Sequence, residues 1–164
     1  MTYPEIDPAI GVGYQMTIVR TFDAPRELVF DCFTDERHMA AWWGPRHFTN
    51  PVCELDARPG GAILIHMQGP PEWPVNPMGG EYVVVDRPER LVFVSRAFQG
   101  EDGESGIDNL NELTFEATED GKTLMTLTAT VRKVSAEVAP ALGGMKEGWS
   151  QSLDKLGELL VELQ

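Results

Sequence analysis

The sequence is poor in positive charge. Its 164 residues include 13 lysines and arginines against 26 aspartates and glutamates, so the formal net charge is −13. A nucleic-acid partner needs a basic surface for its phosphates, and an anionic membrane attracts basic segments, so this balance argues against both. The acidic excess is typical of a soluble protein, and a basic protein partner is the alternative.

Cysteines and long apolar runs are also scarce. The two cysteines, Cys32 and Cys53, are not spaced as a CxxC pair and do not resemble a disulfide framework, which favours a reducing, cytoplasmic setting. No segment approaches the roughly 18 apolar residues of a membrane span, and no signal-peptide pattern is visible. We therefore expect no membrane insertion.

The familiar catalytic and metal-binding patterns are missing. The three histidines, His38, His47 and His66, do not lie at metal-ligand spacing. There is no HExxH, no GxSxG, no phosphate-binding GxxxxGK[ST], and no GxGxxG between a strand and a helix. We expect no metal and no cofactor.

A strong helical pattern closes the chain. From Gly144 the sequence reads GMKEGWSQSLDKLGELLVELQ, and its apolar residues recur at steps of three and four: Met145, Trp149, Leu153, Leu156, Leu160 and Leu163. Such spacing predicts one long amphipathic helix. A helix of this length needs a large apolar partner.

Two short helices are expected after a first strand over residues 15–22. Asp23 followed by Pro25 predicts the start of the first helix, with Asp23 as its capping side chain. Asp35 can cap a second helix, which Gly44 and the following proline end.

The remainder of the chain up to Arg132 is dominated by strand patterns separated by turns. A proline-rich loop is predicted at 70–80 and an acidic, solvated loop at 99–108. The further strands are predicted at 48–56, 62–68, 81–86, 91–98, 110–118 and 124–132. Short connections indicate an antiparallel sheet. Residues 1–14 lack periodicity and predict a flexible arm, and 15–164 are predicted to form a single domain.

Alternation along these strands predicts which side chains face the terminal helix. Inward-facing positions are expected at Ile63, Ile65, Met67, Glu81, Val83, Val85, Leu91, Phe93, Ser95, Ala97, Asn109, Asn111, Leu113 and Phe115. Apolar walls with a few polar groups are typical of a small-molecule pocket. An ordinary core with polar residues at its strand ends is the alternative.

Five short motifs occur in order along the chain: Thr21–Phe30, Trp42–Pro45, Val52–Gly61, Pro88–Phe93 and Glu147–Trp149. This series resembles the SRPBCC superfamily, and within it the branch of homologues of the activator of heat-shock protein 90 ATPase. The resemblance implies an α+β helix-grip fold. In that fold a curved antiparallel sheet wraps a long C-terminal helix, and a hydrophobic cavity lies between them.

Binding of a hydrophobic small molecule, lipid-like, aromatic or polyketide-like, is the leading functional hypothesis. The candidate ligand-binding residues are Trp43, Ile63, Ile65, Met67, Glu81, Val83, Phe93, Ser95, Asn111, Leu113, Met145, Trp149 and Leu153. A cyclase-like or hydrolytic enzyme is a second hypothesis, with Glu81 as its one candidate acid or base. A chaperone-associated interaction module is a third, and a homodimer stays open.

Overall fold

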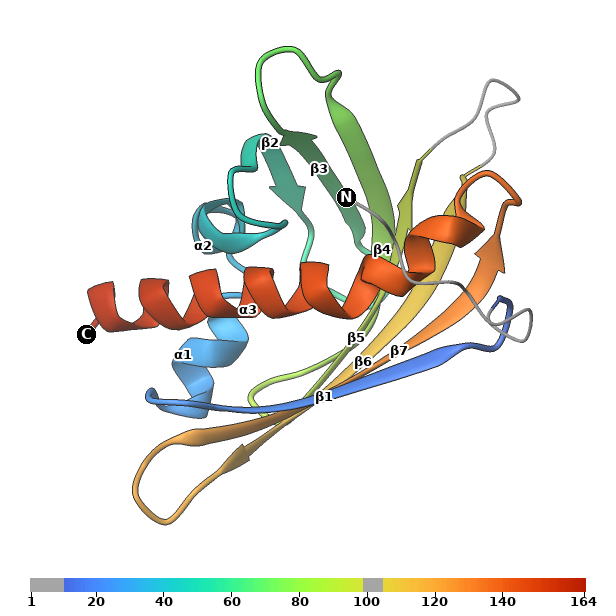
Figure 1. Ribbon diagram of the computed structural model, residues 1–164. Helices are drawn as coiled ribbons and strands as arrows, with labels where there is room; N and C mark the ends of the chain where they lie inside the picture. Colours follow the sequence, from blue (N-terminus) through green and yellow to red (C-terminus); the bar gives the residue numbers. More distant parts are fainter. Residues whose placement is uncertain (1–10, 99–104) are drawn as a thin grey trace.

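A seven-stranded antiparallel sheet carries a long helix across one face. The computed structural model describes residues 11–98 and 105–164. The strands lie in the order β1-β7-β6-β5-β4-β3-β2, and α3 crosses the sheet while α1 and α2 follow β1 (Figure 1). This arrangement confirms the predicted helix-grip fold.

The strands are β1 (Gln15–Phe22), β2 (Thr49–Leu55), β3 (Ala62–Gln68), β4 (Asn76–Asp86), β5 (Arg90–Ala97), β6 (Ile107–Ala117) and β7 (Thr123–Val134). The helices are α1 (Arg26–Asp31), α2 (Glu36–Trp42), the 3₁₀ helix η1 (Ala139–Gly144) and α3 (Met145–Glu162). In the part of the chain that the structure describes, no helix is long and apolar enough to cross a membrane.

The two short helices begin differently from one another. Asp35 caps α2 as predicted, because its side chain accepts a hydrogen bond from the Arg37 backbone N–H at 2.9 Å. The predicted Asp23 cap of α1 is wrong. Pro25 occupies the capping position of that helix, and no side chain caps it.

Several boundaries differ from the sequence prediction, and three of the differences matter for the argument. β4 begins at Asn76, inside the predicted proline-rich loop, and β6 begins at Ile107, so Asp108 lies in a strand and not in the acidic loop. Residues 99–104 of that loop and residues 1–10 of the predicted arm lie outside the described residues. The end of the predicted arm is already paired with β7, since the Gly13 N–H donates to the Val131 carbonyl at 2.7 Å.

The core lies between α3 and the inner face of the sheet. α3 buries one stripe of its surface: Trp149, Ser152, Leu153, Leu156 and Leu160. The sheet opposes it with Met16, Ile18, Ile63, Ile65, Met78, Tyr82, Leu91, Phe93, Leu113, Phe115, Met125, Leu127 and Ala129. Each such large apolar side chain contributes about 1.5–3 kcal/mol by leaving water.

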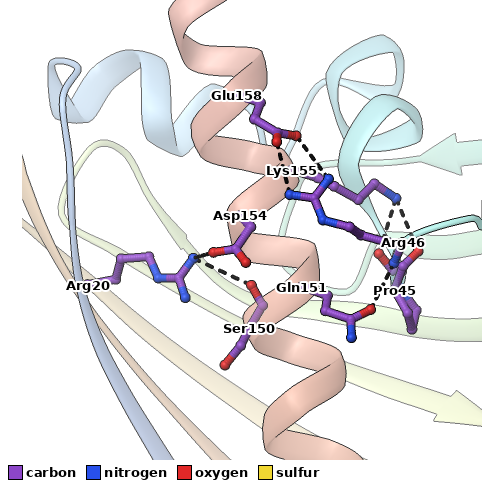
Figure 2. Close-up of polar contacts among 9 residues, drawn as sticks. Arg20, Pro45, Arg46, Ser150, Gln151, Asp154, Lys155 and Glu158 are labelled. Atoms are coloured by element: carbon purple, nitrogen blue, oxygen red, sulfur yellow. Dashed lines mark hydrogen bonds and ion pairs between the residues drawn. The ribbon is translucent and has the colours of Figure 1, made fainter.

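Polar contacts tie α3 to β1 at one edge of the sheet. The guanidinium of Arg20 on β1 donates to the carboxylate of Asp154 at 2.7 Å and also contacts the Ser150 carbonyl (Figure 2). On its other side, α3 contacts the loop after α2, and α2 packs beside β2 at the opposite edge. The helix is therefore held over the sheet from both sides.

A row of alternating charges crosses the outer face of the sheet. Arg96 donates to Glu81 at 2.8 Å and to Asp108 at 2.9 Å, and Arg132 donates to Asp108 at 2.8 Å. Burial alone would raise the pKa of Asp108, but the hydrogen bonds from the two arginines outweigh it and lower that pKa below its ordinary value. The network joins β4, β5, β6 and β7.

Replacing Asp108 with Asn should therefore destabilise the fold in a pH-dependent way. Because the folded-state pKa lies below the unfolded one, the ionised carboxylate stabilises the protein above the unfolded pKa. That contribution is lost as the pH falls through the folded pKa. At pH 7 we expect Asp108→Asn to lower the free energy of unfolding by about 2 kcal/mol, measured by urea denaturation.

The difference between the wild type and Asp108→Asn should shrink steadily below about pH 4. Glu116→Gln is the matched control, since Glu116 is an exposed carboxylate on the same strand. It should change stability by less than about 0.5 kcal/mol. A pH-independent loss in Asp108→Asn would contradict the electrostatic account.

Candidate functional site

α3 covers the middle of the inner face fully and one end of it only in part. Ile63, Ile65 and Phe93 are fully buried, whereas Met67, Ser95 and Ala97, further along the same faces of β3 and β5, are half-buried. Met145, the first residue of α3, is also half-buried. We call the region of Met67, Ser95, Ala97 and Met145 the open end of the sheet.

Three aromatic rings from different elements meet beside the open end. The ring of Trp43, just after α2, lies 5.3 Å from the ring of Trp149 on α3 and 6.1 Å from that of Phe93 on β5. Both contacts are edge-to-face, the arrangement that aromatic quadrupoles favour. These rings form an apolar wall between the packed core and the half-buried residues.

Asn111 on β6 contributes an unpartnered acceptor to this region. Its amide nitrogen donates to the Phe93 carbonyl at 3.3 Å and to the Ser95 hydroxyl oxygen at 3.0 Å. Because a carbonyl only accepts, the Phe93 contact fixes the orientation of the amide. Asn111 Oδ1 is left buried without a hydrogen-bond partner.

Two further polar atoms nearby are buried and unpartnered. Asn109, on the same face of β6, places its amide nitrogen 3.5 Å from the Met145 sulfur, and its Oδ1 has no partner. Trp43 Nε1, a donor, has none either. Each buried polar atom left without a hydrogen bond costs about 1–3 kcal/mol of stability. Three such atoms in one small region are unusual, because most buried polar groups in proteins are hydrogen-bonded.

Lys155 fixes the loop that presents Trp43. Its ammonium lies within 3.5 Å of four backbone carbonyls, those of Trp43, Gly44, Pro45 and Phe48, with the shortest contact 3.1 Å to Gly44. Burial lowers the pKa of this ammonium, and the Arg46 charge lowers it further against the opposing effect of Glu158. Gly44 in this loop has a φ of 91°, a backbone conformation that glycine adopts without strain.

The same loop is joined to α3 by an ion pair. The Arg46 guanidinium donates to both carboxylate oxygens of Glu158, at 2.9 and 3.3 Å, and the Arg46 backbone N–H donates to Gln151 (Figure 2). A groove of about 350 Å³ runs beside these contacts, lined by Ala41, Arg46, His47, Lys155, Glu158, Leu159 and Glu162. The Arg46 and Lys155 side chains in this groove already have hydrogen-bond partners within the protein.

The structure brings together six of the candidate residues predicted from the sequence. They are Trp43, Phe93, Ser95, Asn111, Met145 and Trp149. Met67 lies at the open end as well. Ile63, Ile65, Leu113 and Leu153 face the same interior but lie within the fully packed core, so a role in ligand contact stays a prediction for them.

The inward orientation predicted for Glu81 and Val83 is wrong. Glu81 pairs with Val94, which alternates with the inward-facing Phe93, so the Glu81 carboxylate lies on the outer face with Arg96. The pairing of β4 with β5 shifts register between Tyr82 and Val84. Val83 lies at this shift and is 45% exposed. A β-bulge interrupts strict alternation, so inward Val85 did not imply inward Val83.

The outward orientation of Glu81 also removes the catalytic candidate from the interior. The hydrogen bond from Arg96 lowers the pKa of the Glu81 carboxyl and keeps it ionised. Burial raises the pKa of the Cys32 thiol to about 12 and that of Cys53 to about 11, so neither is a thiolate nucleophile at neutral pH. In the ranges 11–98 and 105–164, no three His, Cys, Asp or Glu side chains gather as a metal site.

Sequence reasoning missed two features of the candidate site. Alternation placed Asn109 inward, but only the packed structure reveals that its oxygen and the Trp43 N–H lack partners. Lys155 is a charged residue in an amphipathic helix, and no local pattern indicates that it reaches four carbonyls more than a hundred residues earlier.

Comparison with protein families adds a finding of a different kind. The model of the family described as activator of Hsp90 ATPase homolog 1-like protein matches residues 23–161. The chain belongs to this family. The match covers the two short helices, strands β2–β7 and nearly all of α3. A search of the curated proteins gives no match.

Solved structures share the family fold over nearly the whole chain. Protein CV1439 from Chromobacterium violaceum is 25% identical with a TM-score of 0.76, covering 89% of this chain and 96% of its own. Protein Ms6760 from Mycobacterium smegmatis is 28% identical with a TM-score of 0.71, covering 89% and 90%. A protein from Staphylococcus epidermidis is 26% identical with a TM-score of 0.74, covering 100% and 96%.

Replacing Lys155 with Met should loosen the Trp43 loop. Met keeps most of the apolar stem but removes the ammonium, so four carbonyls lose a shared donor. We expect the free energy of unfolding to fall by about 1–3 kcal/mol and the tryptophan emission to shift to the red, measured in one urea titration. Lys146→Met, at an exposed position of the same helix, is the control. Equal losses in the two variants would contradict the role given to Lys155.

Proposed function

We propose that this protein binds a hydrophobic small molecule at the open end of the sheet, between β5, β6 and the start of α3. One observation carries this proposal. Three buried polar atoms without partners, Trp43 Nε1, Asn109 Oδ1 and Asn111 Oδ1, lie beside apolar side chains that α3 covers only in part. A bound molecule would satisfy those atoms, and no such benefit comes from the fully packed half of the core.

Family membership supports the proposal, because the helix-grip fold commonly holds ligands between its sheet and its long helix. The binding free energy would come mainly from apolar burial against the Trp43, Phe93 and Trp149 rings, at about 25 cal/mol per Å² before ordering costs.

Met145 is the side chain that a ligand displaces most readily. It is half-buried, unbranched and flexible, and a sulfur contact of 3.5 Å to Asn109 is weak. It lies at the junction of η1 and α3, so its movement requires no change in the sheet. On binding, the ligand therefore takes the place of the Met145 side chain beside Asn109.

The uncharged dye N-phenyl-1-naphthylamine should bind the wild-type protein saturably, with a rise in dye emission and quenching of the tryptophans. Ala97→Trp should weaken binding at least tenfold, because Ala97 faces inward at the open end and an indole there fills the space. Val83→Trp is the matched control, since Val83 is exposed on another part of the sheet.

Glu81→Gln should bind the dye as the wild type does, because Glu81 lies on the outer face. Circular dichroism checks that each variant is folded. Absence of saturable binding to the wild-type protein, or unchanged affinity in Ala97→Trp, would reject this site.

A further inference from the structure

The unpartnered atoms restrict the chemistry of the ligand more than the apolar walls do. Asn111 is fully buried and Asn109 is 8% exposed, and each has an amide oxygen without a partner. Asn109 and Asn111 are two positions apart on one face of β6, so their Cα atoms lie about 7 Å apart along the strand. Both oxygens accept hydrogen bonds and cannot donate them.

One donor complements these acceptors. Trp43 Nε1 is buried and free, in a ring that is 8% exposed and packed against Phe93 and Trp149. The Ser95 hydroxyl accepts from Asn111 Nδ2, so its own proton remains available to an acceptor. The site is therefore complementary to a molecule with at least one hydrogen-bond donor and one acceptor.

The charges around the site also restrict the class of ligand. The two arginines at this end of β5 and β7, Arg96 and Arg132, are engaged on the outer face by Glu81 and Asp108. A carboxylate ligand placed at Asn109 and Asn111 would face two amide oxygens, whose partial negative charges repel it. Burial of an uncompensated charge is far more costly than burial of a neutral hydroxyl that donates to those oxygens.

Resting on the function proposed above, we infer that the ligand is an uncharged, hydroxylated aromatic molecule. Its hydroxyl donates to the amide oxygen of Asn111, a lone pair of the hydroxyl oxygen accepts from Trp43 Nε1, and its ring lies against the wall of Trp43, Phe93 and Trp149. Fatty acids and other carboxylates of similar size are excluded as preferred ligands.

Three probes of equal ring size separate this inference from simple hydrophobic binding. At pH 7, 2-naphthol is uncharged and carries a donor, naphthalene has no polar group, and 2-naphthoate is an anion. Isothermal titration of the wild-type protein should give an affinity for 2-naphthol about tenfold above that for naphthalene, with 2-naphthoate the weakest of the three.

Asn111→Leu tests the residue assignment, because Leu keeps the volume and removes the acceptor. It should weaken 2-naphthol binding about tenfold while changing naphthalene binding less than twofold. Thr128→Val is the control, since Thr128 lies on the outer face of β7 and should leave all three affinities unchanged. If Asn111→Leu does not fold, the ranking of the three probes on the wild-type protein decides the inference.

The outcomes separate the two proposals. Binding of naphthalene and 2-naphthoate as tightly as 2-naphthol would overturn the ligand class and leave the hydrophobic site standing. Failure of all three probes and of N-phenyl-1-naphthylamine to bind the wild-type protein would overturn both.

Discussion

Burial of the apolar stripe of α3 against the inner face of the sheet is the interaction on which the rest of the structure depends. The stripe provides Trp149, Leu153, Leu156 and Leu160, and the central strands provide the opposing surface. Contacts at both edges hold the helix in place, through Arg20 on β1 and the loop around Arg46 (Figure 2). Without that cover, one face of the sheet would expose its whole apolar surface to water.

The cover is incomplete, and this gives the molecule its candidate site. α3 begins at Met145, and the inward side chains near the ends of β3 and β5, Met67 and Ser95, are less buried than those further along the strands. Figure 1 shows α3 crossing the sheet. Polar side chains tolerated there, Ser95, Asn109 and Asn111, would be costly in the centre of the core. Lys155 links the packing of α3 to the candidate site, because this residue of α3 also holds the loop that carries Trp43.

Sequence patterns predicted the fold well where one regular period governed a segment. The strands at Gln15–Phe22 and Ala62–Gln68 and the helix at Met145–Glu162 follow uninterrupted alternation or helical spacing. Prediction failed where local geometry breaks the period. The bulge after Tyr82 reversed the expected orientation of Val83, and Glu81 was assigned inward on the same assumption.

The sequence by itself determined the layout: an amphipathic terminal helix, strands with one apolar face, and inward positions for Ser95 and Asn111. These follow from the periods of helix and strand, which each residue's neighbours in the chain set. Tertiary structure alone decided which inward polar atoms keep a partner and which do not. Hydrogen bonds such as that from Asn111 to the Phe93 carbonyl join residues on different strands. Whether a buried polar atom finds a hydrogen-bond partner therefore depends on packing between strands.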